Sequence, residues 1–283
     1  IPVSFYRLAK PEVIGPILAS MPILHNAPVR FLTDAQFDEL DEVVMRCAYA
    51  SQNKLGRLCE EAVYENDLAA RLRAEGVGEV HTQVPVAVSF RGFEKVYRLD
   101  LIVQGMIYEL KAVERLGGAH DAQVYHYGAL VETDRIKLLN FGDTKVKGKL
   151  RIAPVTTAQR HACNISTSGW QPLSPQCQLL NEHLASLVDD LGGFLEASLY
   201  QEALSFTLSA PETRLTVTSN GVDLGTHSLP ILAEYVAFHV SAYTDYIGHR
   251  RSHFQRLLAT LPLKCLHWIN FNHHDITLTT LIK

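Results

Sequence analysis

The stretch Tyr97–Lys111, YRLDLIVQGMIYELK, constrains the fold more than any other part of the sequence, because it places charged side chains in an apolar run. Most of its other positions are Leu, Ile, Val, Met or Tyr, as in a buried strand. A buried charge is costly unless it is paired or binds a metal. The charges that matter most, Asp100, Glu109 and Lys111, therefore need an explanation.

These three residues are predicted to meet on one face of a hairpin. The stretch reads as two extended segments that join at a turn near Gln104-Gly105. Side chains alternate along a strand, so Glu109 and Lys111 share a face, and Asp100 on the preceding strand lies close to Glu109. Two neighbouring carboxylates repel unless a hard cation binds them, and the ammonium group can orient a water or stabilise a phosphate. The triplet alone leaves open an ion-pair cluster that only shapes the sheet.

The flanking sequence predicts an α/β core with a mixed sheet. A helix is expected from Thr33 or Asp34, capped by Thr33 and continuing, with a break at 51–53, to about Gly76. The period then changes to that of strands, with a further turn at Arg91-Gly92. The expected order is a strand at 81–90, strands at about 95–103 and 106–113, a helix at about 121–131 and a strand at 136–141.

The segment DTKVKGKLR (143–151) carries four basic residues and one acid. It is expected to be either a solvated edge or a loop that contacts phosphate. Residues 156–178 are polar and contain Pro172 and Pro175, which favours a linker.

The second half repeats parts of the first. LGGFLEASLYQEAL (191–204) aligns without a gap with LGRLCEEAVYENDL (55–68), and LHWINF (266–271) echoes LLNF (138–141). Two matches in the same order predict an internal duplication. The second copy contains no D…ExK pattern, so we expect it to lack a catalytic site.

The second half is expected to open with one helix over 179–208, continue with strand-like segments over 214–229 and then form a long helix over about 230–261. The predicted organisation is an N-terminal arm (1–32), an α/β domain with the charged triplet (33–155), a linker (156–178) and a degenerate second α/β copy (179–283).

The amino-acid composition limits the class of protein and the compartment that can be expected. A chain of 283 residues with 47% hydrophobic residues can bury a sizeable core. A net charge of −4 excludes a uniformly basic coat for nucleic acid but not a local basic groove. Five scattered cysteines without a CxxC pair argue against a disulfide framework and suit a reducing compartment. No apolar run spans a membrane and no signal peptide is recognised, so a cytoplasmic protein is expected.

A longer pattern resembles a known family. LCEEAVYENDLAARL, QVPVAVSFRGFEKVYRLDLIV, YELKAVERL, HDAQVYHYGAL and KLLNFG follow one another within residues 50–155. This series is similar to the GxxExxY family within the PD-(D/E)XK nuclease superfamily. Two positions depart from the pattern: Leu58 stands where the GxxExxY motif has its Gly, and Leu99 stands where the superfamily has Pro.

The resemblance implies a nuclease-like core, a mixed β-sheet flanked by helices, and a role for each matching residue. Asp100, Glu109 and Lys111 correspond to the metal-binding and catalytic triplet. Glu61 corresponds to the helix glutamate, with Glu60 as a rival. Gln123 and Tyr127 match an AQ…Y helix motif and share a helix face, although core packing explains Tyr127 equally well. The Leu110 carbonyl is expected to complete the metal ligands.

The predicted function is hydrolysis of phosphodiester bonds by an Mg²⁺- or Mn²⁺-activated water, with DNA favoured over RNA as the substrate. The alternative is a non-catalytic module that uses the same fold to bind nucleic acid or a partner protein. A homodimer is left open, and the second half is left open as a lid, a dimer surface or a DNA-binding arm with a basic helix face at His249, Arg250, Arg251 and Arg256. The residues expected to contact nucleic acid are Arg57, Arg98, Tyr127, Lys145, Lys147 and Lys149.

Overall fold

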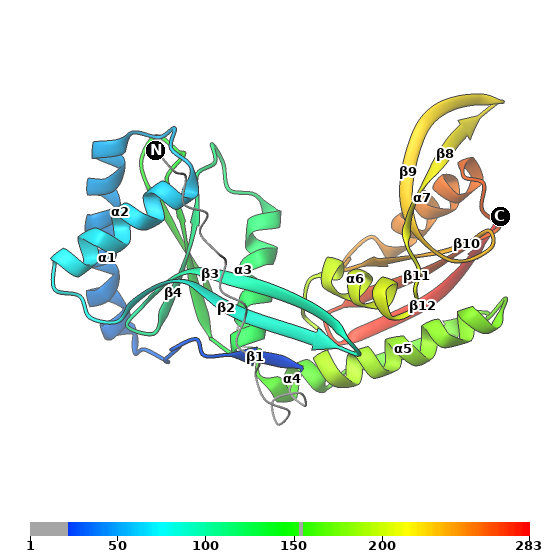
Figure 1. Cartoon of the computed structure of the whole chain (residues 1–283), viewed down its shortest axis with the longest axis horizontal. Helices are drawn as coiled ribbons and strands as arrows, with labels where there is room; N and C mark the ends of the chain where they lie inside the picture. Colours follow the sequence, from blue (N-terminus) through cyan, green and yellow to red (C-terminus); the bar gives the residue numbers. More distant parts are fainter. Residues whose placement is uncertain (1–21, 153–154) are drawn as a thin grey trace, which may run out of the picture.

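The structure is a computed structural model that describes residues 22–152 and 155–283. Its two six-stranded sheets, one in each half of the chain, both combine parallel and antiparallel pairs (Figure 1). The predicted α/β class with a mixed sheet is therefore confirmed. No helix in the described ranges is long and apolar enough to cross a membrane. Most of the predicted N-terminal arm lies outside the described residues.

The first sheet has the strand order β1-β2-β3-β4-β5-β6, and only β4 and β5 pair in parallel. Helices α1 and α2 pack on one face of this sheet and α3 on the other (Figure 1). The elements of this half are β1 (Ile23–His25), α1 (Asp34–Leu55), α2 (Glu61–Ala74), β2 (Val80–Phe90), β3 (Phe93–Val103), β4 (Met106–Lys111), α3 (Gly118–Val131), β5 (Arg135–Asn140) and β6 (Lys147–Ile152).

Both turns predicted in this half are present. Arg91-Gly92 and Gln104-Gly105 have positive φ at each residue, as tight hairpins of right-handed twist require. At Gly105 a Cβ would also lie 2.7 Å from Cβ of Arg30, so the position needs glycine for space as well as conformation. The second of these turns fixes the register of β3 against β4, and with it the position of the charged triplet.

The start of α1 is as predicted, but its end is not. Thr33 is the N-cap, and its hydroxyl accepts a hydrogen bond from the Gln36 N–H. The break predicted at 51–53 is wrong, because Gln52 is buried within the helix and its amide donates to the carbonyls of Phe141 and Asp143. The helix ends instead at Gly56, with φ of +78°.

The second sheet has the order β7-β12-β11-β10-β9-β8, and β10 and β11 pair in parallel within it. From α1 to β6 and from α5 to β12, helices and strands follow in the same order, and in each half the third of these strands is parallel to the fourth. The elements are α4 (Thr157–His161), β7 (Asn164–Gly169), α5 (Pro175–Leu191), α6 (Ala197–Thr207), β8 (Glu212–Ser219), β9 (Val222–Ala233), β10 (Val236–Ser241), α7 (Ile247–Thr260), β11 (Cys265–Asn272) and β12 (Asp275–Ile282).

Two helix predictions in the second half are wrong. The segment 179–208 is broken at Gly192, whose φ is +71°, and forms α5 and α6. The long helix expected over 230–261 is the end of β9, then β10, then α7. The apolar run of β10, VAFHVS, is short and almost wholly buried, and periodicity does not distinguish such a strand from a buried helix.

The basic segment and the predicted linker also contain regular structure. Residues 147–152, expected as a solvated edge or loop, form the edge strand β6, whose exposed lysines protect the open edge of the sheet. Within 156–178 lie α4, β7 and the start of α5, and β7 pairs with β12 as the edge of the second sheet.

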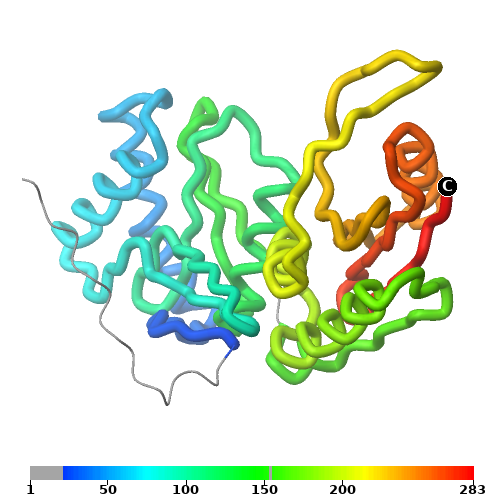
Figure 2. The backbone as a smooth tube through the Cα atoms, turned by 45° about the vertical axis from the view of Figure 1, so that its right-hand side comes forward, coloured from blue at the N-terminus to red at the C-terminus, as the bar shows by residue number. Residues whose placement is uncertain are grey.

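The two halves share one apolar core. Side chains of α3 and of the first sheet, such as Val124 and Ile107, belong to the same buried cluster as Leu195 and Leu199 around α6. A polar contact reinforces this interface, because Glu196 accepts a hydrogen bond of 2.5 Å from the Tyr97 hydroxyl. Figure 2 shows the start of the second half against the first at this interface.

Candidate active site

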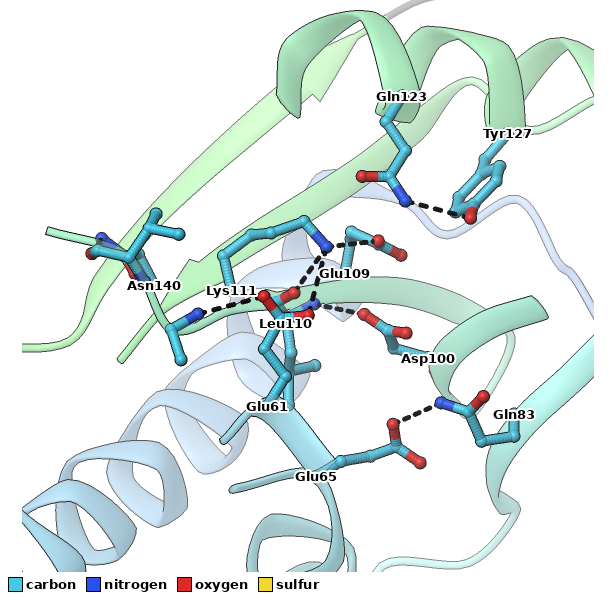
Figure 3. A network of polar contacts seen from close by, with 12 residues as sticks. Glu61, Glu65, Gln83, Asp100, Glu109, Leu110, Lys111, Gln123, Tyr127 and Asn140 are labelled. Atoms are coloured by element: carbon cyan, nitrogen blue, oxygen red, sulfur yellow. Dashed lines mark hydrogen bonds and ion pairs between the residues drawn. The ribbon is translucent and has the colours of Figure 1, made fainter. Parts of the chain in front are cut away.

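The predicted triplet converges at the end of β4. Lys111 Nζ lies 2.8 Å from Glu109 Oε1 and 2.8 Å from the Leu110 carbonyl oxygen, to both of which it donates. The Leu110 N–H donates to Asp100 Oδ2 at 2.8 Å, so the carboxylate on β3 is held against β4 (Figure 3). Sequence alternation and the position of the turn therefore predicted the convergence correctly.

Burial of this cluster shifts the pKa values of its ionisable side chains. Glu109 is only 1% exposed and Lys111 7%. Burial, and then the charge of Asp100, raises the pKa of Glu109 to about 8, against the opposing effect of Lys111. Burial also raises the pKa of Asp100. Burial would lower the pKa of Lys111, but Glu109 and the other carboxylates outweigh it, so the pKa is raised and the amine keeps its charge.

Glu61 joins the cluster from the first turn of α2. Its Oε2 lies 3.6 Å from Lys111 Nζ, and its Oε1 accepts from the Ala112 N–H at 3.4 Å. The rival residue, Glu60, is the exposed N-cap residue of α2 and makes no side-chain capping bond. Of the two glutamates, Glu61 is therefore the one that the structure brings to Lys111.

Gln123 and Tyr127 lie one turn apart on α3, as their spacing predicts. The Gln123 amide donates to the Tyr127 hydroxyl at 3.0 Å, and Figure 3 shows both side chains above the triplet. Burial, and then the charge of Glu109, raises the pKa of Tyr127 to about 12. Tyr127 is 6% exposed and belongs to the core, so it packs in the core and faces the site at once.

Sequence reasoning missed a further polar pair beside Asp100. The Gln83 amide donates to Glu65 Oε2 at 2.5 Å, and Glu65 is 6% exposed (Figure 3). Gln83 has φ of +52° within β2, and the pairing of β2 with β3 skips both Gln83 and Asp100. This irregularity turns the amide towards Glu65. The signal available in the sequence was Glu65 itself, which is one helical turn after Glu61.

An open groove of about 1120 Å³ adjoins the triplet at Ala112 and Asn140. Three residues predicted to contact nucleic acid line it, namely Arg57, Lys147 and Lys149, together with Arg115. Lys145 is exposed but is not among the lining residues. Arg98 is also outside the lining, and its guanidinium donates to the Gln83 carbonyl at 3.3 Å.

The donor set fits a hard divalent cation, although one ligand has to move. Glu109 Oε2 is buried and has no hydrogen-bond partner, and the surrounding carboxylate and carbonyl oxygens are the ligands that Mg²⁺ prefers. Among the described residues, no three His, Cys, Asp or Glu side chains are already gathered as a metal cluster. Glu61 is held by Lys111, but its side chain is 44% exposed and so is free to rotate.

Comparison with known proteins bears on the same region. Residues 38–152 match the model of the PD-(D/E)XK nuclease superfamily. The matched range contains the triplet, Glu61, Gln123 and the basic residues of the groove. Members of this superfamily are generally nucleases, and the likeness to them lies in the first half of the chain.

Other comparisons add little. No curated protein matches the sequence. One solved structure, "Crystal structure of SSO0001", is 16% identical and covers 42% of this chain and 68% of that chain. Its TM-score is 0.27, so this likeness carries no argument about fold or function.

Proposed function

We propose that the chain is a metal-dependent nuclease. The observation that carries the proposal is the buried triplet, in which Glu109 Oε2 lacks a partner while Asp100 and Lys111 are held beside it. A structural ion pair needs one acid for one base, whereas this site places several carboxylates around one lysine. An excess of carboxyl groups around one lysine, beside a basic groove, favours a cation and a phosphate as the missing partners.

Each residue then has a distinct role. Glu61, Asp100, Glu109 and the Leu110 carbonyl would hold Mg²⁺ or Mn²⁺, and the ion would supply an acidified water and offset charge on the scissile phosphate. Lys111, fixed by Glu109, keeps a positive charge at the end of β4, where it orients the attacking water. Gln123, already placed by Tyr127, is positioned to donate to a phosphate oxygen.

The substrate is proposed to be nucleic acid, with DNA favoured over RNA. The groove beside the triplet carries Arg57 and Arg115, for which the described residues contain no carboxylate partner within ion-pair distance. Lys147 and Lys149 are paired only with Asp143 and Asp121, through exposed contacts that phosphates can replace. The narrower assignment to the GxxExxY family stays a prediction.

The second half is proposed to be a repeat of the first without its chemistry. Asn140 accepts from the N–H of Val113 and donates to its carbonyl, and Asn270 makes the same two bonds to Tyr243. The strand registers that pair Lys111 with Asn140 and Ser241 with Asn270 align the halves residue by residue. On this alignment the positions of Glu109 and Lys111 are occupied by His239 and Ser241. The alignment of residues 55–68 with 191–204 puts Ala197 at the position of Glu61.

The test is a cleavage panel. Single-stranded, double-stranded and branched DNA, and RNA, are incubated with the full chain and Mg²⁺ or Mn²⁺, beside the Asp100→Ala protein. We expect cleavage of DNA that needs the metal and is absent from the variant. Calorimetric titration with each metal is run in parallel. The absence of both cleavage and Asp100-dependent metal binding, with or without DNA, would favour the non-catalytic module.

A further inference from the structure

The charged side chains of helix α7 in the second half are all of one sign. Its sequence, IGHRRSHFQRLLAT, contains Arg250, Arg251 and Arg256 and no acid, and no acidic residue occurs between Asp245 and Asp275. Only Leu258 is buried in this helix. The helix is therefore exposed over most of its length, and its three charged side chains are all basic.

The arginines of α7 are not used for internal ion pairs. Within the described residues, all three lie beyond ion-pair distance of any carboxylate, whereas Arg30, Arg46 and others pair with acids. Arg250 instead lies over the Tyr243 ring, with its guanidinium carbon 4.4 Å from the ring centroid, and this cation–π contact favours that position of the guanidinium. An arginine that is held in place without a carboxylate remains able to bind an anion in a bidentate way.

The neighbouring hairpin lies beside α7 and carries one arginine, Arg214, and two acids, Glu212 and Asp223. Strands β8 and β9 project from the second half, at the end of the molecule away from α1 and α2 (Figures 1 and 2). Thr218 of β8 donates to the Thr260 carbonyl at 3.4 Å, so the hairpin is anchored to α7. The tip turns at Asn220-Gly221 and carries Val222 and Leu224, 57% and 63% exposed. The basic side chains of α7 match a phosphodiester backbone, and the exposed apolar side chains at the hairpin tip match a base step that they can wedge open.

We propose that α7, together with the β8–β9 hairpin, binds the phosphodiester backbone of nucleic acid at a second place, separate from the groove beside the triplet. The proposal rests on the proposed nucleic-acid substrate but not on cleavage. Because this surface lies at the end of the molecule away from α1 and α2 (Figure 1), it engages the same nucleic acid as the groove only when that molecule is long enough to extend beyond the first half. The second half thus acts as an arm that holds the substrate.

The experiment measures binding without chemistry. Fluorescence anisotropy of labelled duplexes of increasing length is recorded in EDTA across a salt series, for the full chain and for the variant Arg250→Ala/Arg251→Ala/Arg256→Ala. The matched control, Arg30→Ala/Arg46→Ala/Arg73→Ala, removes the same charge from the first half. We expect the α7 variant to lose affinity for long duplexes and the slope of log K against log salt to fall by about 1 per arginine, with the shortest duplexes unaffected.

Two outcomes would overturn the proposal: equal binding by the α7 variant and the unaltered chain, or an equal loss in the control variant. Far-ultraviolet circular dichroism shows whether the variant is folded, and Arg→Lys replacements at the same positions should restore most of the salt dependence. Binding that depends on α7 in a chain that does not cleave would retain this proposal and reject the nuclease. Cleavage together with binding that does not depend on α7 would retain the nuclease and reject this proposal.

Discussion

Lys111 Nζ lies 2.8 Å from Glu109 Oε1 while Glu109 Oε2 has no hydrogen-bond partner, so one lysine satisfies only half of a carboxylate that is 1% exposed. Such a half-satisfied buried acid is costly unless a further cation completes it. The first expected consequence concerns activity. Asp100→Asn, which keeps the shape of the side chain but removes its charge, should lower the cleavage rate by at least about 100-fold.

The same loss is expected for Asp100→Ala and Lys111→Ala, with the fold retained in each. Initial rates on the preferred substrate and circular dichroism of the purified variants check this. Glu94→Ala, an exposed acid on the same strand, is the matched control and should cleave at the normal rate. Retained cleavage by either triplet variant would sink the site assignment.

A second prediction concerns pH. The pKa of Glu109 rises from 4.5 to about 8 in the folded chain, through burial and then the charge of Asp100. The folded state therefore holds a proton that the unfolded state releases. The stability linked to this proton is fully present below the unfolded pKa and is lost as the pH rises through the window up to the folded pKa, by up to about 1.4 kcal/mol per pH unit.

Thermal unfolding in EDTA between pH 5 and pH 8 measures this loss. Glu109→Gln should flatten the dependence, because the amide does not titrate. Mg²⁺ or Mn²⁺ should raise the unfolding temperature most at the high end of the range, where the carboxylate is ionised. A pH profile that Glu109→Gln leaves unchanged would show that the linkage belongs to other groups.

A third prediction concerns the backbone at Gln83, whose φ is +52°. Gln83→Ala and Gln83→Gly both remove the hydrogen bond to Glu65, but only glycine adopts this φ without strain. The alanine variant should be the less stable of the two by roughly 1 kcal/mol. Urea denaturation of both proteins decides the matter, and a less stable glycine variant would mean that no strain is stored there.

A fourth prediction concerns the contact between the halves. Glu196 accepts from the buried Tyr97 hydroxyl and lies 3.3 Å from Lys95 Nζ. Glu196→Ala should destabilise the chain by about 1–3 kcal/mol, because Tyr97 loses its partner. Glu202→Ala removes an exposed acid that contacts the same lysine and should cost less than about 1 kcal/mol. Equal losses in urea denaturation would show that the interface bond contributes nothing.

The central hairpins were the most predictable part of this fold. Their turns at Arg91-Gly92 and Gln104-Gly105 have a strong local signal, and side-chain alternation then brings Glu109 and Lys111 to one face. Elements without an apolar pattern were missed, because β6 is an exposed edge strand and its lysines resemble a loop. The short β10 was missed for the opposite reason, since its buried run has no period to identify it.

The pair Glu65 and Gln83 was not predictable from local pattern. Gln83 is at a break in the pairing of two long strands, and nothing in the alternation of β2 indicates that one residue there has a positive φ. Its partner Glu65 is assigned to the site only once the helix is packed on the sheet. Contacts that depend on such irregularities follow from three-dimensional packing and not from sequence spacing.

The superfamily match ends at Ile152, but the apolar core continues into α6. A recombinant fragment cut at that limit would separate the part of this cluster in the first half, which includes Val124 and Ile107, from the part around α6, which includes Leu195 and Leu199. Such a surface favours aggregation over solubility. Boundaries drawn by sequence matching are therefore poor guides to fragment design in this chain, and an inactive or insoluble fragment would say little about the catalytic competence of the chain that contains both halves.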